Sequence, residues 1–255
     1  MDLSFDLSRS GDYTSASQIA RVLSESWFGE NMYCPACSCE ELETLPNNTK
    51  VMDFRCPECG EPYQLKASSK RFGNTIVNSE YYTKIRKIKA GETPNWSLLE
   101  YDIEDYFVKN LMVIPRHFLT PVIIQKRAPL SQTARRAGWT GSNVLIGRLP
   151  DDAKLYVIRD EKEVPRSDVI RQWKRFEFMR RRRLNQKGWI NDVLYCIRRL
   201  DKEEFTLSEM YDFEDYLSGL YPRNRHVKDK IRQQLQYLRD EGIIEFVGRG
   251  EYRVK

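Results

Sequence analysis

Residues 50–68, KVMDFRCPECGEPYQLKAS, place a Cys-x-x-Cys pair between two runs that we interpret as β-strands, 50–54 and 62–68. A metal-binding pair at that position would serve as the turn of a hairpin and would hold both strands in register. Any chemistry carried on those strands would then be positioned by the metal. The residues on both strands are therefore interpreted from this hairpin outward.

A second pair, Cys34-Pro-Ala-Cys37, lies 18 residues before Cys56-Pro-Glu-Cys59. This spacing is typical of a zinc ribbon, because each pair supplies two thiolates to one side of a tetrahedral ion. The alternatives are two disulfides, which are disfavoured in a reducing cytosol, or a redox pair, which needs no matched second pair. We predict that Zn²⁺ is bound by Cys34, Cys37, Cys56 and Cys59.

A zinc ion with four cysteine ligands has no open coordination position, so its role should be structural. Of the six cysteines, two stand outside this set. We expect Cys39 to be a spare thiol and Cys196 to be a small core residue of a helix.

The predicted strands carry a candidate active site. Gln64 and Lys66 lie two residues apart on one strand and therefore share a face, and an adjacent antiparallel strand can bring Asp53 beside them. A carboxylate, an amide oxygen and an ammonium group at one point can hold Mg²⁺ and orient a water molecule. Taken alone, this triple is a weak signal, and its alternative is a set of solvated polar groups at a strand edge.

The pattern Asp53…Gln64-Leu65-Lys66 resembles the PD-(D/E)XK nucleases, whose motif is an aspartate followed by Asp/Glu-x-Lys on a neighbouring strand. The resemblance covers residues 15–85 and implies that Asp53, Gln64 and Lys66 are catalytic. It further implies Mg²⁺ ligands from Asp53, Gln64 and the carbonyl of Leu65. Gln64 replaces the usual second acid, which puts a two-metal mechanism in doubt.

Helix 15–27 would stand in the place of the family's first helix. Further strands are expected at 111–114, 122–125, 143–147 and 155–159, since these runs are rich in β-branched residues. The fold class is α/β (α+β): a PD-(D/E)XK-type mixed sheet flanked by helices, with an inserted four-cysteine zinc site.

The last 70 residues show three helical patterns and a hairpin, the order of a winged helix. The first pattern begins at Trp189. The second opens with the capping box Thr206-Leu-Ser-Glu209 and stops at Pro222, and the third covers 225–239. Two alternating strands then flank a Gly-Arg-Gly turn. We expect two domains: residues 1–183, a nuclease domain with the zinc site, and residues 184–255, a winged-helix DNA-binding domain.

The sequence as a whole resembles the methyl-directed type II restriction endonucleases. That resemblance implies a Mg²⁺-dependent enzyme that cuts double-stranded DNA at GATC sites carrying N6-methyladenine. It also implies that each domain reads the methylated sequence. No companion methyltransferase would be required, because such an enzyme spares unmethylated host DNA. We expect the chain to act as a monomer.

Candidate DNA contacts fall into three groups. A polar, glycine-flanked loop carries a single large aromatic residue, which could form an apolar wall for the adenine methyl group or could be a buried anchor of the loop. Basic residues just after Lys66 could contact phosphates, and the third helix of a winged helix enters the major groove. The predicted contacts are Trp139, Arg135, Arg136, Lys70, Arg71, Arg223, Arg225, His226, Lys228, Arg232 and Arg249.

Composition limits the alternatives. The chain has 255 residues, 40% of them hydrophobic, which excludes a largely disordered protein. No apolar run is long enough to span a membrane, and the first residues lack the apolar core of a signal peptide, so we expect a cytoplasmic protein with no membrane partner. A net charge of +5 alone would not establish a nucleic-acid partner.

The main alternative function is a non-enzymatic zinc-ribbon and winged-helix regulator that only binds DNA. RNA processing is disfavoured, because the C-terminal part lacks the aromatic stacking platforms of RNA-recognition domains.

Overall fold

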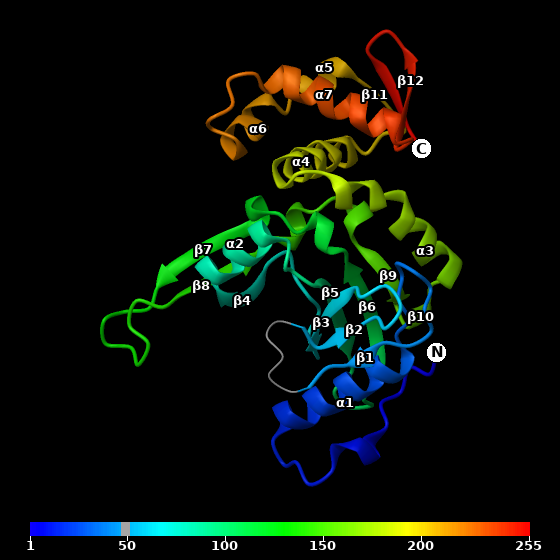
Figure 1. Ribbon diagram of the computed structural model, residues 1–255, viewed down its shortest axis with the longest axis vertical. Coiled ribbons are helices and arrows are strands. Elements are labelled where there is room, and N and C mark those ends of the chain that lie inside the picture. Colours follow the sequence, from blue (N-terminus) through cyan, green and yellow to red (C-terminus); the bar gives the residue numbers. More distant parts are fainter. Residues whose placement is uncertain (47–51) are drawn as a thin grey trace. The chain divides into compact units, whose positions relative to one another are not determined.

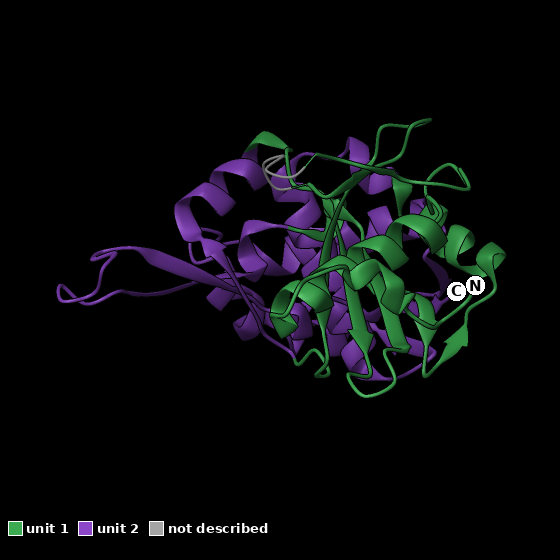
Figure 2. Cartoon of the chain, turned by 90° about the horizontal axis from the view of Figure 1, so that it is seen from below, with its two compact units in different colours: residues 1–73, 90–119, 154–177 green, residues 74–89, 120–153, 178–255 purple. Residues whose placement is uncertain are grey.

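The computed structural model describes residues 1–46 and 52–255. They form two compact units, each built from several segments of the chain (Figure 2). Unit 1 comprises residues 1–73, 90–119 and 154–177, and unit 2 comprises residues 74–89, 120–153 and 178–255. Among the described residues, no helix combines the length and the apolar character needed to cross a membrane.

Unit 1 contains a seven-stranded mixed sheet with the strand order β1-β2-β3-β5-β6-β9-β10 (Figure 1). Only β3 and β5 run parallel, and all other neighbours are antiparallel. The strands are β1 (Glu43–Thr44), β2 (Phe54–Arg55), β3 (Pro62–Ser68), β5 (Asn95–Tyr101), β6 (Val108–Ile114), β9 (Leu155–Arg159) and β10 (Lys162–Glu163).

The sheet confirms part of the strand prediction. Strands 62–68 and 155–159 have the predicted bounds, and 111–114 is the second half of β6. The expected strand 50–54 begins only at Phe54, and residues 50 and 51 lie outside the described residues. Strand β5 was not predicted.

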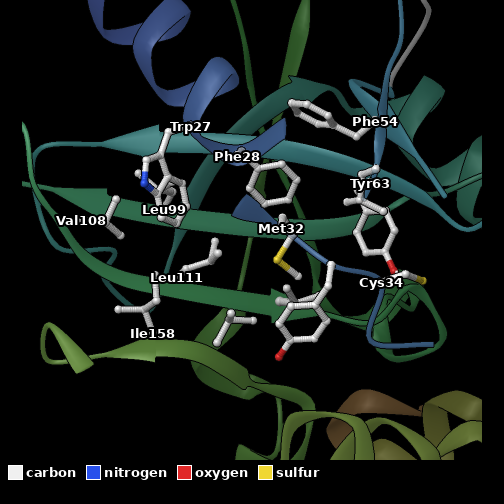
Figure 3. Close-up of a cluster of buried hydrophobic side chains, with 14 of the residues drawn as sticks. Trp27, Phe28, Met32, Cys34, Phe54, Tyr63, Leu99, Val108, Leu111 and Ile158 are labelled. Carbon is white, nitrogen blue, oxygen red and sulfur yellow. The ribbon is translucent and has the colours of Figure 1, made fainter. Parts of the chain in front are cut away.

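Two helices cover the sheet of unit 1, α1 (Ala16–Asn31) and α3 (Arg166–Arg175). Helix α1 buries Leu23, Trp27 and Phe28, which recur at helical spacing and pack into the core against strand residues such as Leu99 and Leu111 (Figure 3). The rings of Phe28 and Phe54 lie 4.7 Å apart, so β2 is packed directly against α1. The α/β class, with a sheet flanked by helices, is confirmed.

Unit 2 contains a second, three-stranded antiparallel sheet and a winged helix. The sheet has the strand order β4-β8-β7. Helix α2 (Tyr81–Ala90) follows β4 directly in the chain. The predicted strands 122–125 and 143–147 are both shifted, because short 3-10 turns occupy 121–123 and 146–148. The strands are β4 (Ile76–Glu80), β7 (Ile124–Pro129) and β8 (Thr140–Val144).

The C-terminal part has the predicted order of helices and wing. The first helix starts earlier than expected, and the second is divided in two after the capping box, in which the Glu209 backbone N–H donates to Thr206 Oγ1 at 3.2 Å. A short strand before this box, not predicted, adds a third strand to the wing. The elements are α4 (Leu184–Leu200), β11 (Glu204–Thr206), α5 (Leu207–Tyr211), α6 (Glu214–Leu220), α7 (Val227–Asp240), β12 (Ile244–Gly248) and β13 (Glu251–Val254).

Asp192 of α4 is an acidic group in the core of this helical part, with 2% of its surface exposed. The Tyr221 hydroxyl donates a hydrogen bond of 2.5 Å to its carboxylate, and the Tyr221 ring stacks on Trp189 with centroids 3.9 Å apart. Burial raises the pKa of Asp192 to about 6, although the bond from Tyr221 opposes the shift.

This buried carboxyl should make unit 2 less stable as the pH rises. Its pKa in the folded state lies above the value of 3.8 expected for an exposed aspartate, so the folded state holds a proton more tightly. The resulting stabilisation is complete below about pH 3.8 and is lost as the pH rises through about 6. We expect Asp192→Asn to gain up to about 2 kcal/mol relative to wild type between pH 4.5 and 7.5.

Urea unfolding of both proteins over this pH range measures the difference. Asp212→Asn, the same substitution at an exposed position, serves as the control. A constant difference between Asp192→Asn and wild type would contradict the assignment.

Candidate active site and metal centre

Four cysteine thiols meet at the end of the β2–β3 hairpin. The Sγ atoms of Cys34, Cys37, Cys56 and Cys59 all lie within 4.8 Å of one another. Two of the pairs are Cys37–Cys56 at 3.4 Å and Cys34–Cys59 at 3.6 Å. A tetrahedral zinc ion with Zn–S bonds of about 2.3 Å separates its sulfur ligands by about 3.8 Å. The cluster therefore has the dimensions of a zinc site, and the predicted ligands are brought together.

The two cysteine pairs have matching backbones. In each, the residue after the second cysteine has a positive φ, 69° at Ser38 and 72° at Gly60. The Ser38 N–H donates to the Cys34 carbonyl and the Gly60 N–H to the Cys56 carbonyl, at 2.9 and 3.0 Å. These turns point both thiols of a pair in the same direction. The second pair connects β2 to β3, as expected for the turn of this hairpin.

The two remaining cysteines differ in their surroundings. Cys39 Sγ is directed to the carbonyl oxygen of Glu41 at 3.4 Å and also lies within hydrogen-bond reach of the Cys56 thiol, so its role as a spare thiol stays a prediction. Cys196 is fully buried in α4, as predicted for a core residue.

Tyr63 is a contact of the cluster that the sequence did not reveal. Its hydroxyl lies 3.1 Å from Cys34 Sγ, and the ring is fully buried in the core (Figure 3). Burial raises the pKa of Tyr63, so the hydroxyl keeps its proton and can donate it to a thiolate. The alternation of apolar and polar residues in β3 indicates a buried Tyr63, but only the structure shows which group it meets.

Asp53 lies immediately before β2 and is held by backbone bonds on both sides. Its N–H donates to the Tyr63 carbonyl and its carbonyl accepts from Leu45, both at 2.9 Å. The side chain accepts a bond of 2.8 Å from the Leu65 N–H to Oδ2. The carboxylate therefore lies over the middle of β3, in the position that the hairpin prediction required.

Gln64 and Lys66 flank Leu65 on β3 and share one face of the strand. The Gln64 Oε1 atom is buried and has no hydrogen-bond partner among the described residues. An amide oxygen in this state is unfavourable unless another group binds it. A cation held between this oxygen and the Asp53 carboxylate would satisfy it, so the donor set fits a hard divalent ion.

The charges of the site interact. Burial raises the pKa of Asp53, although the bond from Leu65 and the charge of Lys66 oppose the shift. Burial lowers the pKa of Lys66, and the charge of Asp53 opposes this. Each group therefore lies within electrostatic reach of the other, and together they form an acid–base pair beside a free amide oxygen. Lys70 and Arg71 follow on the exposed chain after β3.

In unit 2, strands β7 and β8 are joined by a basic loop that holds Trp139, Arg135 and Arg136. The Trp139 ring is half-buried, and the Arg136 guanidinium lies 4.9 Å from its centroid. A side chain at Gly141 would come within 3.0 Å of this ring, so the glycine makes room for the indole. Exposed basic residues on β7, Lys126 and Arg127, were not predicted, although the run Gln-Lys-Arg carried the signal.

The remaining predicted DNA contacts lie on the winged helix, and all of them are exposed. Three have neighbouring partners: Lys228 forms a 3.1 Å ion pair with Glu214, the Arg232 guanidinium lies 5.6 Å from the Tyr211 ring, and His226 Nδ1 lies 3.9 Å from a carboxylate oxygen of Asp229. The others, in the chain before α7 and at the turn of the wing, are Arg223, Arg225 and Arg249.

Two protein-family models match the chain. The DpnI model, described as the Dam-replacing family, matches residues 1–182, which is more than half of the chain. The DpnI_C model, described as the Dam-replacing HTH domain, matches residues 185–254. The first match includes the cysteine cluster and the Asp53–Lys66 pair, and the second includes all of α7 and the wing strands.

The contact between Tyr63 and Cys34 predicts that Tyr63→Phe weakens zinc binding about tenfold, because a hydrogen bond to a ligand sulfur is lost while the ring is kept. Release of zinc to a coloured chelator measures the change. Tyr156→Phe, on β9, is the matched control and should bind zinc as wild type does. Equal zinc release from wild type and Tyr63→Phe would rule out this role for the hydroxyl.

Proposed function

We propose, on the premise that the chain belongs to the DpnI family, the Dam-replacing family, that it is a Mg²⁺-dependent endonuclease that cuts double-stranded DNA at GATC sites carrying N6-methyladenine. The family indicates a methylation-dependent restriction enzyme that acts on DNA. The single observation that supports catalysis by this chain is the grouping of Asp53, Lys66 and the unpartnered oxygen of Gln64 on one hairpin.

In this proposal the Asp53 carboxylate, the Gln64 amide oxygen and the Leu65 carbonyl would hold Mg²⁺. The bound ion would polarise the scissile phosphate and lower the pKa of a water molecule. Lys66 orients that water and stabilises the charge that develops on the phosphate. The partial burial of Lys66 strengthens this interaction, because the surroundings screen its charge less than water does.

The cysteine cluster would hold a structural Zn²⁺ that keeps β2 and β3 in register. Since Asp53 adjoins β2 and Lys66 lies on β3, the zinc site would set their separation without touching the substrate.

Residues 1–183 would cut and residues 184–255 would read DNA as a winged helix. The second family model, an HTH domain, supports DNA binding by the latter. The N-terminal residues of α7 would enter the major groove, with arginines in position for guanine or phosphate. Lys70 and Arg71 would bind phosphates. Trp139 would provide the apolar wall for the methyl group, with Arg135 and Arg136 anchoring its loop on the backbone. The enzyme would act as a monomer without a companion methyltransferase.

A cleavage assay tests the activity. Dam-methylated plasmid is incubated with Mg²⁺ and wild type, Asp53→Ala or Lys66→Ala. We expect cutting by wild type and a loss of at least about a hundredfold in each variant, because each removes a group that acts on the reacting phosphate. Asp105→Ala and Lys162→Ala, exposed positions of the same unit, are the matched controls and should cut normally.

Binding of the same DNA, measured without Mg²⁺, should be nearly unchanged in Asp53→Ala. Intact plasmid with wild type, together with specific binding, would instead support the non-enzymatic regulator.

The assignment of Trp139 predicts a change of specificity. Trp139→Ala should lower the preference for methylated over unmethylated GATC about tenfold, since an apolar contact with the methyl group is lost. The measurement is the ratio of cleavage rates on matched duplexes with and without the methyl group. Trp139→Phe keeps an aromatic wall and should retain most of the preference. An unchanged ratio in Trp139→Ala would overturn the assignment.

A further inference from the structure

A hollow of about 370 Å³ opens in unit 1 between α1 and the carboxyl end of β3. Serine hydroxyls from both elements line it, and one arginine and one glutamate of α1 complete its polar wall. These residues are Ser17, Ser24, Ser68, Ser69, Arg21 and Glu25.

The hollow has a basic side at Arg21. This arginine is exposed, and within the described part of the chain its charge acts on Glu25 without a close ion pair. Glu25 lies one helical turn further along α1, in the less favourable i, i+4 order for an arginine and a glutamate. The guanidinium therefore remains available to a ligand, and its planar set of donors matches a phosphate group.

The other side of the hollow adjoins the candidate active site. Burial raises the pKa of Glu25, the charge of Arg21 opposes the shift, and the charge of Asp53 adds to it. Glu25, which lines the hollow, thus lies within electrostatic reach of Asp53. Leu65, whose N–H binds Asp53, also lines the hollow.

We propose that this hollow binds an internal phosphodiester of the cleaved strand, next to the scissile phosphate, through Arg21 and the hydroxyl of Ser69. The inference rests on the proposed nuclease function and deepens it. A strand whose scissile phosphate lies at Asp53 must continue past one edge of the site. Besides the Glu25 carboxyl, the hollow offers the Arg21 guanidinium and serine hydroxyls, the kinds of donor that proteins use to fix the register of a DNA backbone. Ser69 is exposed, follows β3 directly and lines the same hollow as Arg21, where its hydroxyl also bonds with that of Tyr101.

A charge-neutralisation experiment on the full chain tests the pairing. Short methylated duplexes carry one neutral methylphosphonate at each position around the cut site in turn. At one position, wild type should lose about tenfold in kcat/KM, because a charge-assisted bond is removed. Arg21→Ala should show that loss already on the unmodified duplex, mainly in KM, and should lose little more when the same phosphate is neutral.

Arg21→Lys should retain part of the effect, because the charge remains but the two-pronged geometry is lost. Arg159→Ala, an exposed arginine of β9, is the matched control and should respond to each methylphosphonate as wild type does. Salt titrations of DNA binding should show a slope smaller by about one in Arg21→Ala.

The outcomes separate this inference from the nuclease proposal. If wild type cuts and Arg21→Ala keeps the full methylphosphonate profile, the subsite is wrong while the nuclease stands. If wild type does not cut, the salt slope still decides whether Arg21 binds DNA. Inorganic phosphate distinguishes the source: competitive inhibition by phosphate at low millimolar concentration that disappears in Arg21→Ala, with no position-specific methylphosphonate effect, would indicate a free-phosphate site and overturn the proposal.

Discussion

The contact between four sulfur atoms of residues 34–37 and 56–59 is the constraint on which the rest of the site depends. Strand β2 has two residues, and each is paired with one residue of β3. Two residue pairs are too few for a hairpin that is stable by itself. The thiol cluster closes this hairpin at one end, and the packing of Phe54 on Phe28 holds it against α1. Between these two restraints, Asp53 is fixed by backbone hydrogen bonds to Leu45 and Tyr63. A small movement of the hairpin would separate the carboxylate from β3.

In the proposed metal site, Gln64 stands where the PD-(D/E)XK nucleases have an acid, and its neutral amide has an electrostatic consequence. Asp53 and Lys66 are both half-buried, and their opposite charges compensate one another. A second carboxylate at position 64 would leave a net negative charge in a partly desolvated site, which is costly without a bound cation. The neutral amide avoids this, and its unpartnered oxygen still offers a ligand atom. The site is thus balanced in charge before any ion arrives.

Much of this arrangement could be predicted from the sequence, because it depends on local spacing. A spacing that can be counted along the chain predicts three of its features: the cysteine pairs, the alternation of apolar and polar residues in β3, and the apolar face of α1. Strand β5 escaped prediction since it is buried on both faces and includes polar residues. Asn95, for example, is fully buried and donates to Glu61 and to the Pro62 carbonyl, contacts about thirty residues away in sequence. Likewise, the contact of Tyr63 with Cys34 and the hollow beside Arg21 arise only when distant segments meet.

The second compact unit combines residues 74–89 and 120–153 with the C-terminal winged helix, although the family models divide the chain between 182 and 185. Within this unit the Arg198 guanidinium donates two hydrogen bonds of 2.6 Å to the Asp152 carboxylate, which is only 8% exposed. A fragment that ends near residue 183 would retain this carboxylate but lose its cation. Transferring the winged helix to another protein would therefore require residues 74–89 and 120–153 to be moved with it. The compact units thus differ from the division between the two family models.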